Sequence, residues 1–176
     1  YTDDPTGTSG WTRASMPHIS PDRDNMSAEL EPSSFIRADG GIVMVFRDQN
    51  GSFKKLASLS SDNGATWTKP VETNMPDSRS KQSAGNLPKG TAYQVSNPSG
   101  NKDRYPLVLT LSQDGKVFDR AYLLRSLSDL PTRKYPGPYR GFSYPKSTIW
   151  KEYLYVGYSV NKEDINISRV PITSLE

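Results

Sequence analysis

Apolar and polar residues alternate along this chain over short runs, which is the pattern of half-buried β-strands. The runs are rich in Val, Ile, Tyr and Thr, and turn residues such as Asp39-Gly40 and Lys89-Gly90 separate them. The predicted strands are residues 33–37, 42–47 and 53–60, then 83–87, 91–97 and 106–112, and finally 144–150, 153–159 and 165–172. No stretch shows the 3.6-residue period of a long amphipathic helix, so the chain is predicted to be all-β.

A polar turn follows the third run and recurs along the chain. It reads Ser60-Ser61-Asp62-Asn63-Gly64-Ala65-Thr66-Trp67, and a weaker copy reads Ser112-Gln113-Asp114-Gly115-Lys116-Val117-Phe118. Their glycines are 51 residues apart, and Ser9-Gly10-Trp11-Thr12 resembles the end of a further copy. A period near 50 residues with several short strands in each repeat indicates a β-propeller.

The first copy of this turn is expected to be structural. The side chains of Ser60 and Asp62 can bind N–H groups of their own loop, and Gly64 allows the positive φ that such turns need. Thr66 completes the turn, and Trp67 is expected to bury its ring beneath it.

The repeats predict about three four-stranded blades in this chain. The expected boundaries are 1–28 for the end of a preceding blade and its connecting loop, then 29–76, 77–130 and 131–176. Because propellers close with roughly four to eight blades, we expect this chain to supply half of a six- or seven-bladed ring. The remaining blades would come from the rest of the protein or from another chain.

Composition narrows the possible partners. The chain has 176 residues, no cysteine, 34% hydrophobic residues and a formal net charge of +3, with a mean hydropathy of −0.70 and a pI of about 9.0. The positive charge mildly favours an anionic partner, but the basic residues are dispersed, so nucleic acid is not expected. No apolar run is long enough to span a bilayer, and no motif indicates a metal or a cofactor.

The polar turn is the Asp box, and around it the chain resembles the sialidase (neuraminidase) superfamily, in its C-terminal half. The resemblance starts at Glu31-Pro32, continues through Asp39-Gly40 and the Asp box to Ser96-Asn97-Pro98-Ser99-Gly100 and Arg104, and ends at Phe142-Ser143-Tyr144-Pro145. It implies a propeller glycoside hydrolase that is secreted, periplasmic or on the cell surface.

The resemblance also implies roles for individual residues. Tyr144 would be the nucleophile, Glu31 would accept its proton, and Arg104 would pair with the substrate's carboxylate. The second arginine of the carboxylate-binding triad would fall at Lys54, which keeps the charge without the planar fork of arginine. Loops that lead into the inner strands add four further candidate cations for an acidic sugar: Arg79, Lys81, Arg140 and Lys146.

Three functions remain open on the sequence. The first is retaining hydrolysis of terminal anionic sugars by a sialidase-like enzyme. The second is a polysaccharide lyase or a rhamnosidase acting on uronate-containing glycans, which Lys54, Lys81 and Lys146 favour. The third is a propeller that binds glycans without catalysis, because fold alone does not establish activity.

Overall fold

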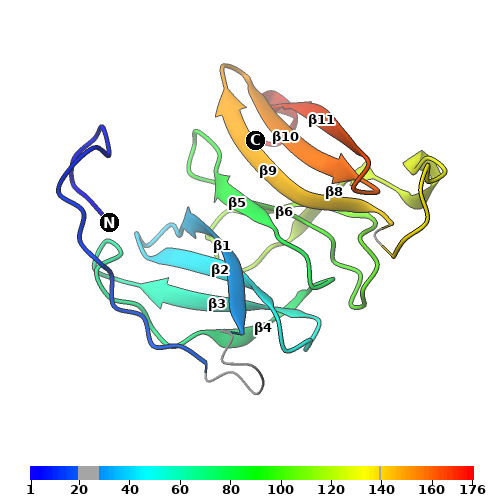
Figure 1. Ribbon diagram of the computed structural model, residues 1–176. Helices are drawn as coiled ribbons and strands as arrows, with labels where there is room; N and C mark the ends of the chain where they lie inside the picture. Colours follow the sequence, from blue (N-terminus) through cyan, green and yellow to red (C-terminus); the bar gives the residue numbers. More distant parts are fainter. Residues whose placement is uncertain (20–27, 139) are drawn as a thin grey trace.

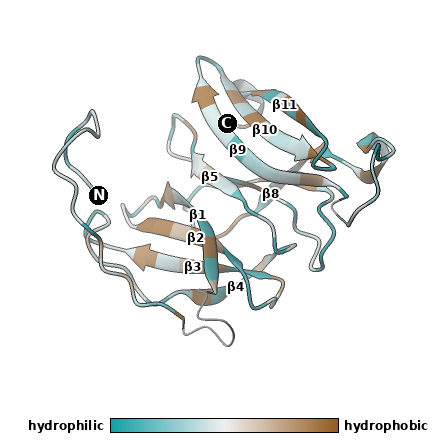
Figure 2. Cartoon of the chain, viewed as in Figure 1, coloured by the Kyte–Doolittle hydropathy of each residue, from teal (hydrophilic) through white to brown (hydrophobic). Residues whose placement is uncertain are grey.

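A computed structural model describes residues 1–19, 28–138 and 140–176, which form three antiparallel β-sheets (Figure 1). Residues 20–27 of the expected connecting loop lie outside the described residues. The nine predicted runs all coincide with strands, whereas the strands at Val71–Pro76 and Arg120–Arg125 lie outside the predicted runs. Each sheet follows chain order as a simple meander. The strongest apolar colour in Figure 2 lies on strands such as β2 and β3, whereas the loops are mostly pale or teal.

Two of the sheets have four strands and the third has three. The first sheet consists of β1 (Glu29–Ile36), β2 (Ile42–Asp48), β3 (Lys54–Ser60) and β4 (Val71–Pro76). The second consists of β5 (Ser83–Asn86), β6 (Ala92–Ser96), β7 (Leu107–Ser112) and β8 (Arg120–Arg125). The third consists of β9 (Phe142–Trp150), β10 (Tyr153–Val160) and β11 (Asp164–Pro171). The expected four strands per blade therefore hold for the first two sheets, and the blade boundaries stay a prediction.

The helical residues in the described part of the chain form short single turns. They are η1 (Leu127–Asp129) and η2 (Ile172–Ser174), both of the 3-10 type. None of the helices in the described part of the chain is long and apolar enough to cross a membrane.

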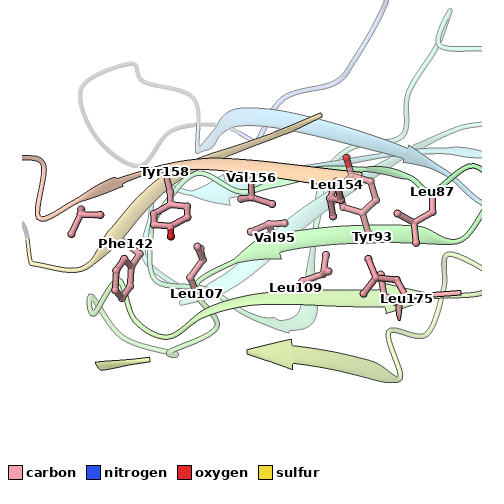
Figure 3. Packing of buried hydrophobic residues seen from close by; sticks show 12 residues of the cluster. Leu87, Tyr93, Val95, Leu107, Leu109, Phe142, Leu154, Val156, Tyr158 and Leu175 are labelled. Carbon is pink, nitrogen blue, oxygen red and sulfur yellow. The ribbon is translucent and has the colours of Figure 1, made fainter. Parts of the chain in front are cut away.

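Neighbouring sheets pack face to face through buried side chains. Between the second and third sheets, Val95 and Leu109 meet Val156 and Tyr158 in a cluster of twelve buried residues, many of them shown in Figure 3. Their burial removes apolar surface from water, which is the main force that holds the sheets together. The innermost strands β1, β5 and β9 consequently lie next to one another, as the inner strands of successive propeller blades do.

The Asp box lies between β3 and β4, and hydrogen bonds from its own side chains hold the turn in shape. The hydroxyl Oγ of Ser60 donates to Oδ1 of Asp62 at 2.8 Å and accepts the backbone N–H of Gly64 at 2.9 Å. The backbone N–H of Thr66 donates to Asp62 at 2.9 Å, and the indole N–H of Trp67 donates to the Gly64 carbonyl at 2.9 Å. Hydrogen bonds from Thr66 and Ser60 lower the pKa of Asp62 from 3.8 to about 2.

Two further turns have the same kind of side-chain hydrogen bonds around an aspartate. In the turn between β7 and β8, Ser112 donates to Asp114 at 3.0 Å, and Phe118 packs edge-on against Phe35 of the first sheet at 5.5 Å between ring centroids. Near the N-terminus, Asp4 accepts hydrogen bonds from Thr6, Thr8 and Ser9, whereas the sequence pattern identified only Ser9 to Thr12. Asp4 and Trp11 are seven residues apart, whereas Asp62 and Trp67 are five apart, so two inserted residues hid the start of this third copy from the spacing argument.

Candidate functional site

Two of the innermost strands, β1 and β9, carry the same backbone irregularity at their leading ends. The register of β1 against β2 shifts between Leu30 and Ser33, and the register of β9 against β10 shifts at Tyr144 and Pro145. Such bulges bend a strand and re-aim a side chain. Glu31, Arg79 and Tyr144 have φ values of 56°, 53° and 54°, a strained region for side chains of this size. Glu31 and Tyr144 lie at the two bulges, whereas Arg79 lies in the loop that precedes β5.

These ends surround a hollow of about 520 Å³, which we call the inner hollow. Its lining residues come from strands and loops of all three repeats. They are Arg47, Gln49, Ser78, Arg79, Lys102, Arg104, Pro138, Tyr144 and Lys162. Of the residues predicted from the sequence, Tyr144, Arg104 and Arg79 therefore meet in one place.

Tyr144 lies between two cations. The guanidinium carbon of Arg104 and the ammonium of Lys162 are each 5.0 Å from the centroid of its ring. Burial of the ring by itself raises the pKa of Tyr144. Hydrogen bonding from Arg104 and the charges of Arg104 and Lys162 outweigh it, and the pKa falls below its usual 10.0. The phenol thus loses its proton more easily than an ordinary tyrosine does.

Arg104 lies close to Tyr144 because its backbone packs directly against a glycine, Gly141. Gly141 pairs with Arg104 in an isolated parallel bridge, and the next residue, Phe142, donates its N–H to the Arg104 carbonyl at 2.7 Å. A Cβ on Gly141 would lie 2.5 Å from that carbonyl oxygen, so a larger residue would push the two segments apart. Nη1 of Arg104 is buried and has no hydrogen-bond partner among the described residues. An anion in the inner hollow would satisfy it.

Glu31 is held by an arginine that sequence reasoning missed. Nη1 of Arg47 donates to Oε2 of Glu31 at 3.2 Å, and Nη2 donates to Oε1 of Gln49 at 2.7 Å. Arg47 could have been found from the hairpin itself. Ile36 pairs with Ile42 across the Asp39-Gly40 turn, so counting outward in equal steps places Glu31 opposite Arg47; the bulge shifts the observed partner to Leu30.

A buried lysine lies behind Glu31. Lys55 is 1% exposed, and its ammonium donates to Oδ1 of Asp77 at 2.6 Å, to the Ser80 carbonyl at 3.1 Å and to Oε1 of Gln82 at 2.9 Å. All three ammonium hydrogens are therefore used, as a buried charge requires. Burial lowers the pKa of Lys55, while the charge of Asp77 opposes this shift.

The side chain of Gln82 connects the buried Lys55 to the bulge in β1. Its amide nitrogen donates to the Glu31 carbonyl at 3.0 Å and to the Val45 carbonyl at 2.8 Å. The bulge removes these carbonyls from regular strand pairing, and the Gln82 side chain from the second repeat replaces the lost bonds. Because Lys55 occupies Oε1, the NH₂ group of Gln82 faces the two carbonyls.

The other predicted cations lie outside the inner hollow. Lys54 is half exposed and pairs with Glu72 at 3.6 Å on the outer strands. Arg140 lies over the ring of Tyr105, with 5.8 Å between its guanidinium carbon and the ring centroid. Lys146 is exposed on β9, and Lys81 does not line the inner hollow. Across the described ranges there is also no group of three or more His, Asp or Glu side chains that could hold a metal ion.

The sheets, the Asp boxes and the inner hollow define a sialidase-type propeller domain. The chain belongs to the family of BNR repeat-like domains, whose model matches residues 1–156. This confirms the superfamily that the sequence motifs indicated. No curated protein matches the chain.

Solved structures agree with the family. A sialidase is 30% identical with a TM-score of 0.61, over 80% of this chain and 13% of its own. A Hadza microbial sialidase is 16% identical with a TM-score of 0.64, over 85% of this chain and 29% of its own. The intramolecular trans-sialidase from Ruminococcus gnavus is 18% identical with a TM-score of 0.57, over 88% of this chain and 35% of its own. The chain thus spans only a minor part of each of these proteins.

Proposed function

We propose that this chain supplies part of the active site of a retaining exo-glycosidase that acts on terminal anionic sugars of the sialic-acid type. The observation that carries the proposal is the position of Tyr144 at a strained bulge, with Arg104 and Lys162 beside its ring and a lowered pKa. A phenol is suited to attack an anomeric centre that bears a carboxylate, because a carboxylate nucleophile would repel it.

In this proposal the oxygen of Tyr144 attacks the anomeric carbon and the bond to the leaving oxygen breaks. Glu31 takes the phenol proton, and Arg47 keeps Glu31 oriented through the 3.2 Å ion pair. Water then hydrolyses the sugar–tyrosine bond with retention of configuration. The leaving oxygen takes a proton from an acid of the further blades, so that it departs as a hydroxyl group.

Arg104 and Arg47 are the candidates to bind the substrate carboxylate. Both line the inner hollow, whereas Lys54 points elsewhere. A guanidinium binds a carboxylate through two parallel hydrogen bonds, which a lysine cannot do. A lysine at the second arginine position was one reason to consider a lyase. That reason weakens, because Arg47 supplies the planar guanidinium there.

We also propose that further blades cover the outward face of the third sheet. Trp150, Ile165 and Ile167 are 59%, 83% and 67% exposed there, opposite the face that packs on the second sheet. Exposed apolar side chains in such a group mark a contact surface. A location outside the cell, in the periplasm, in the medium or on the cell surface, fits the proposed substrate.

The test is hydrolysis of a fluorogenic sialoside by the complete natural protein. Tyr144→Phe is expected to reduce kcat by about three orders of magnitude or more, because it removes the nucleophile. Tyr135→Phe, at an exposed tyrosine, is the matched control and should retain activity. An unsaturated product from a uronate polysaccharide, with no sialoside cleavage, would instead establish the lyase, and binding without either reaction would establish a glycan-binding propeller.

A further inference from the structure

The inner hollow holds more positive charge than one carboxylate requires. Five of its nine lining residues are Arg or Lys. Arg47 pairs with Glu31, but Arg79, Lys102 and Arg104 form no ion pair with a carboxylate of the described residues. If Arg104 and Arg47 bind the substrate carboxylate as proposed, Arg79 and Lys102 remain for another anionic group.

Arg79 is fixed in place. Its backbone has a φ of 53°, which is strained for a non-glycine residue. Its Nη2 donates to the Gln49 carbonyl at 2.7 Å, and its side chain lies along Gly51, where an added Cβ would approach it to 3.6 Å. The guanidinium is therefore a preorganised donor rather than a freely moving surface charge.

Ser78, the neighbour of Arg79, gives an independent sign of a ligand. It lines the inner hollow, is 1% exposed, and its hydroxyl has no hydrogen-bond partner among the described residues. A buried hydroxyl without a partner is unfavourable, and such groups in a binding site are commonly satisfied by what binds there. A hydroxyl and a guanidinium that line one hollow suit the oxygens of a carboxylate or a sulfate ester.

We infer that Ser78, Arg79 and Lys102 form a second anion subsite in the inner hollow. The substrate class is then an acidic glycan with two negative charges close together: the carboxylate at the reacting sugar, and a second carboxylate or a sulfate ester on the same sugar or its neighbour. This inference rests on the proposed function, since it takes the first carboxylate to lie on Arg104.

Calorimetry on the complete natural protein tests the inference, with Tyr144→Phe introduced to prevent turnover. Three ligands are compared: 3′-sialyllactose with one negative charge, its 6-sulfated form, and an α2,8-linked disialic acid. At least one of the doubly charged ligands is expected to bind about tenfold more tightly than sialyllactose, because a charged hydrogen bond adds about that much. Which of the two binds better identifies the second group as sulfate or carboxylate.

The preference should depend on Arg79. Arg79→Gln is expected to weaken the doubly charged ligand about tenfold more than it weakens sialyllactose. Lys69→Gln removes an exposed charge outside the inner hollow and should leave the preference intact. Equal affinity for all three ligands, or equal loss for all three in Arg79→Gln, would overturn the second subsite while the proposed function stands. No binding of any ligand would overturn both.

Discussion

Tyr144 shows how a single side chain acquires its chemistry from its neighbours. Its sequence neighbours Ser143 and Pro145 carry no charge, and the nearby Lys146 is exposed on β9. The shift comes from Arg104 and Lys162, which lie 40 residues before and 18 residues after it in the chain. The bulge in β9 and the bridge between Arg104 and Gly141 bring these groups together.

Removal of the nearest cation should restore an ordinary tyrosine. Arg104→Gln is expected to raise the pKa of Tyr144, since it removes both the hydrogen bond and a charge that favour the phenolate. The measurement is ultraviolet titration of the phenols, with the curve of Tyr144→Phe subtracted to isolate one of the ten tyrosines. Arg169→Gln, where the arginine lies 4.5 Å over Tyr153 instead, is the control. An unchanged Tyr144 curve in Arg104→Gln would contradict the electrostatic account.

Asp62 should make the fold sensitive to acid. Its pKa in the folded chain is about 2, below the ordinary 3.8, so its contribution to stability is complete above pH 4 or so and is lost as the pH falls through about 2. Asp62→Asn is expected to remove that part of the pH dependence in urea unfolding at stepped pH. The control is Asp103→Asn, because that carboxylate accepts no hydrogen bond among the described residues. A wild-type acid slope retained in Asp62→Asn would contradict the role of the Asp box.

At the level of the elements, the bulges of β1 and β9 decide where the chemistry lies. Each bulge shifts side-chain register by one residue and turns Glu31 or Tyr144 through a positive φ. The carbonyls that the first bulge frees are taken up by Gln82. This ties the position of Glu31 to the next repeat, through Gln82 and the buried Lys55.

Gln82→Met should therefore loosen the first repeat against the second. The methionine fills a similar volume but leaves two buried carbonyls and one ammonium hydrogen without partners, which should lower the free energy of unfolding by about 3 kcal/mol. Urea unfolding of Gln82→Met and of the exposed Gln113→Met would measure it. Equal stability of the two variants would show that the Gln82 hydrogen bonds contribute nothing net.

Strands were predictable from the sequence and bulges were not. The alternation in residues 42–47 or 153–159 depends only on local pattern, and the structure has β2 and β10 there. Arg47 could be found only by counting pairs outward from the Asp39-Gly40 turn, whereas the sequence motif led to Lys54. Lys81, Arg140 and Lys146 share loops or strands with site residues but do not line the inner hollow. Alternation alone would put Lys146 on the same face as Tyr144, and the bulge of β9 lies between them. The amino-acid composition does not indicate where these side chains point.

At the scale of the whole molecule, the inner ends of three repeats build one positively charged hollow. Each repeat contributes one residue with a positive φ, namely Glu31, Arg79 and Tyr144. The formal net charge of +3 is small, so the concentration of cations in the inner hollow results from the fold rather than from composition. A field of this kind would attract the anionic sugar of the proposed function to the place where the phenol lies.

The most direct test of the account is to trap the sugar on the protein. A 3-fluorinated sialyl fluoride lets the covalent step proceed while it slows hydrolysis of the product, and mass spectrometry of the digested complete protein then locates the attached sugar. The account predicts one sialyl adduct on the peptide that contains Tyr144, and none in Tyr144→Phe. An adduct on another residue, or turnover of a sialoside with no adduct at Tyr144, would contradict it.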